Sequence, residues 1–228
     1  SVFEAWSDEP WINEGAAVRV SLVAFGENQT IRLNGQPCLK IFADLTGTDE
    51  STAALDLSTA RRLTTNANSV FEGLRKDGPL DITGEVARNW LQQPNPHGVS
   101  NAKVLFPLIN GMDITRRPRD GWVIDTGESM TEQDASLFEA PFGHIAAVVK
   151  PIRLENNDRI RRTYWWRFGR NGENLRSALC SLPRHINTPR VAKHRLFVWQ
   201  LAPAIPDTAT VAIARADDTT FGILHSRF

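Results

Sequence analysis

The sequence lacks the long apolar runs and the cysteine motifs that mark membrane and disulfide-rich proteins. No apolar stretch approaches the roughly 18 residues that a transmembrane helix needs. The only two cysteines, Cys38 and Cys180, form no CxxC or Cys/His cluster, so neither a zinc site nor a disulfide framework is indicated. Both are expected to be buried structural thiols, because a catalytic Cys180 acting with His185 has no supporting signature.

An initiator methionine, a signal peptide and known catalytic motifs are also missing. The chain opens on SVFEAW, without an initiator Met or a signal-peptide pattern, which indicates a fragment of a longer protein that is soluble and cytoplasmic. HExxH, GxSxG and Walker patterns do not occur, and FGRNGEN, residues 168 to 174, lacks the spacing of a phosphate-binding loop. We therefore expect no catalytic residue, metal or cofactor within this chain.

The net charge of zero conceals a strong asymmetry along the chain. Residues 120 to 149 contain six acidic residues and no Lys or Arg, whereas residues 150 to 195 contain twelve Lys or Arg against three acids. A localised basic region in a neutral protein is typical of a surface that binds a polyanion. Nucleic acid is the first candidate.

The densest basic element is RIRRTYWWRFGRNG, residues 159 to 172, which contains five arginines and four aromatic residues. In one interpretation the aromatic residues belong to the core, while the arginines lie on the surface and pair with acids such as those of residues 120 to 149. In the other, the arginines contact phosphates above an aromatic platform. Both interpretations hold if the tryptophans point into the core and the arginines point to solvent. The predicted phosphate contacts here are Arg161, Arg162, Arg167 and Arg170.

Two further basic elements complete the candidate DNA-binding set. TPRVAKHRLFVW, residues 188 to 199, leads into an apolar strand, and an exposed basic patch precedes GWVID. Guanidinium groups match guanine edges or phosphates, and Lys acts as a point charge. The alternative is that these basic residues lie in solvated turns and contact no DNA. The residues concerned are Arg116, Arg117, Arg190, Lys193, His194 and Arg195.

The pattern of strands and helices predicts an α+β fold, because it shows no regular alternation of strand and helix. Alternating apolar residues predict a strand over residues 16 to 26, and Asn34-Gly35 predicts a hairpin within residues 30 to 45. Residues 55 to 91 look mixed and partly helical, and PNPHG, residues 94 to 98, could mark a domain boundary.

In the second half, we expect a turn at Asn110-Gly111 and a strand at residues 121 to 125. Ser129 with Glu132 resembles a capping box that begins a helix. HIAAVVK predicts a helix that Pro151 stops. Three strands are expected at the end, in RLFVWQL, ATVAIAR and TFGIL.

Several separated motifs resemble one family. KVLFPLINGMDITRRPRDGWVID, residues 103 to 125, resembles the NG-x-D-[IL] opening of the target-recognition region in single-chain adenine-N6 DNA methyltransferases. The tryptophan pair at 165 and 166 and TPRVAKHRLF, residues 188 to 197, resemble type IIL restriction-modification enzymes. In these enzymes nuclease, methyltransferase and target recognition share one polypeptide. The resemblance spans most of the chain.

The resemblance implies a division into the C-terminal edge of a methyltransferase domain with a connector, residues 1 to 93, and a DNA target-recognition domain, residues 94 to 228. Residues 3 to 26 are similar to a late methyltransferase motif, from which an aromatic residue packs on the flipped adenine. This implies that role for Trp6 or, second, Phe3. The alternative is that Trp6 fills the core.

The motifs for S-adenosylmethionine, for the catalytic Asn-Pro-Pro-Tyr tetrad and for the nuclease are missing. The resemblance implies that the parent enzyme binds S-adenosylmethionine outside this chain, which would be inactive alone. The expected partners are duplex DNA and the remainder of the parent chain. One alternative is a protein-interaction module in which residues 120 to 149 dock on a basic face like that of residues 150 to 195. The other is an enzyme in its own right.

Overall fold

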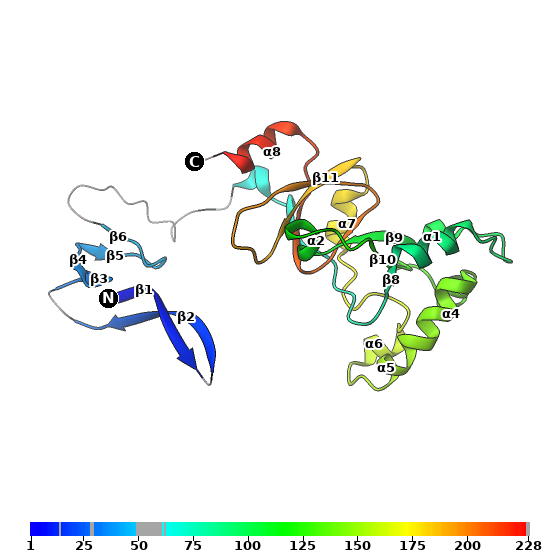
Figure 1. The fold of residues 1–228 in the computed structure, drawn as a ribbon, viewed down its shortest axis with the longest axis horizontal. Coiled ribbons are helices and arrows are strands. Elements are labelled where there is room, and N and C mark those ends of the chain that lie inside the picture. The colour runs from blue at the N-terminus through cyan, green and yellow to red at the C-terminus, as the bar shows by residue number, and fades with distance from the viewer. Residues whose placement is uncertain (14, 28–29, 49–60, 62, 227–228) are drawn as a thin grey trace. The chain divides into compact units, whose positions relative to one another are not determined.

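The computed structural model describes residues 1–13, 15–27, 30–48, 61 and 63–226. It separates into two compact units, Ser1–Thr64 and Thr65–Phe228 (Figure 1). Helices and strands are mixed without a repeating order, so the predicted α+β class is confirmed. No helix among the described residues combines the length and apolarity needed to span a membrane.

The first unit is built on a long antiparallel hairpin. Strands β1 (Val2–Asn13) and β2 (Ala16–Phe25) pair along most of their length, which confirms the strand predicted at residues 16 to 26. The short strand β3 (Arg32–Leu33) pairs with β1 and turns through Asn34 and Gly35 into β4 (Gln36–Pro37), as the hairpin signal predicted. Strands β5 (Lys40–Ile41) and β6 (Gly47–Thr48) form a separate pair.

Few described apolar residues of this unit are buried. Ala5, Ile41 and Phe42 are buried, whereas much of the apolar surface of the hairpin is exposed. Trp11, Val18 and several neighbours lie open to solvent. The unit therefore has only a small core of its own.

The second unit contains two four-stranded sheets. One has the order β13-β9-β10-β8 and the other the order β12-β11-β14-β7. Their strands are β7 (Val70–Glu72), β8 (Asp81–Thr83), β9 (Leu105–Ile109), β10 (Gly121–Ile124), β11 (Arg184–Pro189), β12 (Val198–Leu201), β13 (Ile205–Pro206) and β14 (Thr210–Ile213). The strands predicted in GWVID, RLFVWQL and ATVAIAR are thus present.

Short helices connect and cover these sheets. They are η2 (Thr64–Asn66), α1 (Gly84–Gln92), η3 (Asn101–Lys103), α2 (Gly111–Thr115), α3 (Glu132–Ser136), α4 (Glu139–Val148), α5 (Lys150–Leu154), α6 (Arg159–Thr163), α7 (Glu173–Leu179) and α8 (Asp218–His225). Figure 1 shows α4, α5 and α6 gathered at one end of the unit. One continuous apolar cluster joins strands and helices, and Leu80, Ile124 and Ile145 are among its fully buried members.

Several local predictions need correction. Asn110-Gly111 is not a turn between strands but the beginning of α2, whose N-cap is Asn110. TFGIL lies in helix α8 rather than in a strand, because Asp217 caps a helix there by accepting from the Thr220 amide. Pro151 follows the end of α4 as predicted, but it lies in the first turn of α5, where its missing N–H is harmless.

Another correction concerns Cys180, which is exposed rather than buried, while Cys38 is half-buried. The division between the two compact units falls at residues 64 and 65, and β7, β8 and α1 belong to the second unit. The proposed domain boundary at residues 93 and 94 concerns the parent enzyme and stays a prediction.

Candidate nucleic-acid interface

The two tryptophans of the Arg/Trp segment are buried, as the core interpretation predicted. The indole N–H of Trp165 donates to Glu132 Oε1 at 3.1 Å, and that of Trp166 donates to the Met130 carbonyl at 3.1 Å. The Trp165 ring also packs against Phe142 on α4. Buried indoles normally find such partners, so this pair anchors the segment to residues 130 to 142.

Three of the four arginines predicted to hold phosphates in this segment contact protein groups. Arg167 donates through Nη2 to the Met130 carbonyl at 2.6 Å and lies over the Tyr164 ring. Arg162 donates to the Asn156 carbonyl at 2.6 Å. Arg161 Nη2 lies 2.9 Å from Asp77 Oδ2, an ion-pair distance without hydrogen-bond alignment. Their role in DNA binding stays a prediction, and these contacts give each of them a structural role as well.

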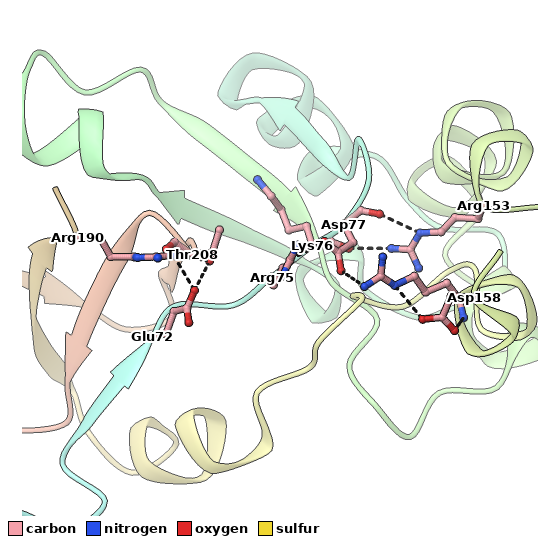
Figure 2. A network of polar contacts seen from close by, with 9 residues as sticks. Glu72, Arg75, Lys76, Asp77, Arg153, Asp158, Arg190 and Thr208 are labelled. Carbon is pink, nitrogen blue, oxygen red and sulfur yellow. Dashed lines mark hydrogen bonds and ion pairs between the residues drawn. The ribbon is translucent and has the colours of Figure 1, made fainter. Parts of the chain in front are cut away.

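Arg161 forms ion pairs with Asp77 and Asp158. Figure 2 shows the network of polar contacts around Lys76 and Asp77, to which Arg153 and Asp158 also belong. Arg153 is only 2% exposed, and its guanidinium donates to the Lys76 and Asp77 carbonyls at 2.8 and 3.1 Å. Burial lowers the pKa of Arg153, although Asp77 opposes this effect. Lys76 Nζ lies 2.6 Å from Asp81 and 3.0 Å from Asp207. The positive charges of Lys76, Arg153 and Arg161 are therefore engaged in contacts that hold segments of the fold together.

A groove of about 480 Å³ lies where α2 ends beside the end of β11. It brings together Arg116 and Arg190, which come from two separate basic elements of the sequence. Met112 and Val191 add apolar surface, 43% and 91% exposed. The lining residues are Asn110, Gly111, Met112, Thr115, Arg116, Arg190, Val191, Thr208 and Ala209.

The base of this groove is fixed by backbone and capping contacts. The Asn110 side chain accepts from the Met112 amide, and Asp113 Oδ2 accepts from the Asn110 amide, which forms a capping box. Gly111 is required because a Cβ there would lie 2.9 Å from the Ala209 carbonyl oxygen. The NG-x-D motif therefore works as a helix start that packs tightly against the neighbouring loop.

The Arg190 guanidinium is held in one orientation at the groove (Figure 2). Its Nη1 donates to Glu72 Oε1 at 2.8 Å and to the Thr208 carbonyl at 3.0 Å. The Thr208 hydroxyl donates to the same Glu72 oxygen at 2.7 Å. The Thr208 hydrogen bond and, after it, the charge of Arg190 lower the pKa of Glu72. Sequence reasoning missed Glu72 and Thr208, because no local pattern links them to Arg190.

The other predicted cations divide into bound and unbound groups. Arg195 donates to the Ser226 carbonyl. Within the part of the chain that the structure describes, five predicted contact residues form no side-chain hydrogen bond or ion pair, and all five are exposed. They are Arg116, Arg117, Arg170, Lys193 and His194. Unlike the paired cations, these side chains can meet an anion without breaking an internal contact.

The aromatic candidates for a flipped base lie in the first unit. Trp6 is half-buried on β1, opposite Leu22 on β2, and Phe3 lies against Gly26. Their stacking role stays a prediction. In the described residues, no group of three or more His, Cys, Asp or Glu side chains could hold a metal ion.

Comparison with known proteins gave one informative kind of match. No family model and no curated protein sequence matched the chain. Among solved structures, the chain is similar to the type IIL restriction-modification enzyme MmeI, solved in complex with DNA, with a TM-score of 0.67 and 16% identity. The match covers 99% of this chain and 31% of MmeI, so the chain spans about a third of the length of that enzyme. At this level of identity the likeness shows that the two share a fold.

Proposed function

We propose that this chain recognises a specific sequence in duplex DNA, as the target-recognition part of an adenine-N6 DNA methyltransferase of the restriction-modification type. The observation that carries the proposal is the groove between α2 and β11, where cations from separate basic elements meet beside exposed apolar side chains. The fold shared with an enzyme solved on DNA supports it. S-adenosylmethionine and the catalytic groups belong to the remainder of the parent chain, and a genomic DNA substrate implies a cytoplasmic location.

The groove, with the exposed cations that follow its lining residues in the sequence, offers two kinds of contact that DNA recognition needs. The unpaired cations Arg116, Arg117 and Lys193 suit phosphates, which position a protein on DNA but carry no sequence information. Arg190 is different, because Glu72 and Thr208 fix its guanidinium before DNA arrives. A preoriented fork is suited to the O6 and N7 atoms of guanine. We assign base reading to Arg190 and phosphate contacts to the unpaired cations.

The alternative of a protein-interaction module relied on acidic and basic faces that would dock on each other. The structure shows such contacts within this chain: Lys150 lies 3.3 Å from Glu132, and Arg176 lies 2.7 Å from Asp125. These pairs satisfy charges that the alternative would leave for a partner. Arg116, Arg117 and Lys193, in contrast, form no ion pair with an acidic residue among the described residues.

Binding to a pool of randomised duplexes at several salt concentrations tests the proposal, with the bound fraction sequenced. We expect one short motif to be enriched and the affinity to fall steeply as salt rises. Salt-sensitive binding without enrichment would assign specificity to the rest of the parent enzyme. Absence of binding would reject the proposal in favour of an interaction module.

Variants separate the two kinds of contact. Arg116→Gln, which removes an unpaired cation from the groove lining, should weaken binding to all sequences and reduce the salt slope by about one. Arg190→Gln should relax the preference at one base pair, by about 1–3 kcal/mol. Arg159→Gln is the matched control, because Arg159 is equally exposed and unpaired among the described residues but does not line the groove.

A further inference from the structure

A second cavity lies apart from the groove between α2 and β11 that is proposed to bind DNA. This pocket of about 340 Å³ is lined by residues of α7, β11, β13 and the start of β9. Leucine, isoleucine, proline and phenylalanine side chains form most of its wall, and no residue of the DNA groove lines it. Several of its lining residues, among them Cys180 and Pro203, are exposed. The pocket is therefore accessible from solvent and mainly apolar inside.

Two buried polar atoms in its lining have no hydrogen-bond partner in the described structure. His185 is 3% exposed, and its Nε2 is unpartnered. Arg176 Nη2 is also buried and unpartnered, although the same guanidinium donates through Nη1 to Asp125 and through Nε to the Asn171 carbonyl. Buried polar atoms are nearly always satisfied, so each such exception requires an explanation. A ligand that bonds both atoms would provide one.

The charges around the pocket indicate which net charge that ligand carries. Asp125 and Arg176 form a buried ion pair at 2.7 Å and cancel each other. Burial lowers the pKa of His185 to about 4, so its ring is neutral near pH 7. The lining therefore has no net charge, and an ionic ligand would lose its hydration without gaining a counter-ion. Water alone is a poor occupant, because most of the wall offers no hydrogen bond.

We propose that this pocket binds a neutral, planar heteroaromatic molecule, whose acceptor nitrogen bonds Arg176 Nη2 and whose second polar atom bonds His185 Nε2. Its flat apolar body would lie against the leucine and proline walls. The site is independent of the proposed DNA function, because the groove and the pocket share no lining residue.

Calorimetric titration of the full chain with benzimidazole and with indole tests the site. The two probes have the same shape and each carries a ring N–H, but only benzimidazole has an acceptor nitrogen. We expect saturable one-to-one binding of benzimidazole, with indole weaker by about tenfold because Arg176 Nη2 would stay unpaired. Equal affinity for the two probes, or no saturable binding of either, would overturn the proposal.

Two variants locate the binding. His185→Phe keeps a ring of similar shape without nitrogen and should weaken benzimidazole binding by about tenfold. Cys180→Trp should block the opening, whereas Cys180→Ser should bind as the unmodified chain does. Because Cys180 is exposed, these two variants should fold even if His185→Phe does not. Benzimidazole binding that persists in Cys180→Trp would refute this location, and unchanged duplex binding there separates the pocket from the DNA function.

Discussion

At the residue scale, His185 gives this protein a defined sensitivity to acid. Its pKa is about 4 in the folded chain because the ring is buried, against an ordinary value of 6.5. The unfolded chain therefore binds more protons between these values, and the folded state loses stability as the pH falls from about 6.5 to about 4. Above this window the contribution is fully present. The difference corresponds to about 3 kcal/mol.

Denaturant unfolding at several pH values tests this contribution. Between about pH 7 and pH 4, the free energy of unfolding should fall by about 3 kcal/mol more in the unmodified chain than in His185→Phe. Parallel curves for the two proteins would show that His185 titrates normally in the folded state.

Glu72 supplies a second prediction at this scale. Its carboxylate orients Arg190 and places a negative charge beside the groove. Glu72→Gln removes that charge and weakens the hold on the guanidinium, so overall DNA affinity should rise while the preference for the enriched motif falls. The measurement is the ratio of the dissociation constants for the enriched and a scrambled duplex. An unchanged ratio would mean that the orientation of Arg190 does not matter for base reading.

At the scale of single elements, the start of α3 distinguishes two residues that look alike in sequence. Thr131 caps the helix: its hydroxyl oxygen accepts from the Asp134 amide at 3.1 Å, and the Thr131 amide donates back to Asp134 Oδ2 at 3.1 Å. Ser129, which the Ser-x-x-Glu pattern favoured, is exposed and lies outside the helix. The capping box exists, but two residues later than predicted.

This shift can be measured with a matched pair of variants. Thr131→Ala should reduce the free energy of unfolding by about 1 kcal/mol, since an amide of the first turn loses its partner. Ser129→Ala should change it by less than about 0.5 kcal/mol. Thermal or denaturant melting is sufficient, and a larger loss for Ser129→Ala would reverse the assignment.

The elements that sequence patterns predicted well are those governed by local chemistry. The alternation in β2 and the Asn34-Gly35 hairpin both follow from neighbouring residues. The misassigned TFGIL segment is apolar and β-branched enough to suggest a strand, but the Asp217 cap begins a helix there. The groove could be predicted only in part: Arg116 and Arg190 stand out as basic residues, whereas their proximity arises from tertiary packing of α2 against β11.

At the scale of the whole molecule, the two units differ in how they are stabilised. The continuous apolar cluster lies entirely within residues 65–228, and that unit also contains the groove proposed to bind DNA. The described part of the first unit buries few apolar residues of its own. We therefore expect the second unit to fold independently of the first.

A truncated chain of residues 65–228 checks this expectation. Because it retains the whole cluster, it should unfold cooperatively, and it should keep the salt-dependent duplex binding of the full chain. Circular dichroism melting and the same duplex titration are the measurements. Loss of a cooperative transition would show that residues 1–64 contribute to the core of the second unit.

The separation between paired and unpaired arginines has a consequence for how such proteins diverge. Arg153 and Arg161 contact the loop around Asp77, so their replacement would harm the fold. Arg116, Arg117 and Lys193 form no such bonds in the described structure, and their replacement should leave folding intact. Related chains can therefore accumulate new residues at these three positions without passing through unfolded intermediates. Because these cations are proposed to contact phosphates, the affinity for DNA and its dependence on salt would then change over generations faster than the scaffold that presents them.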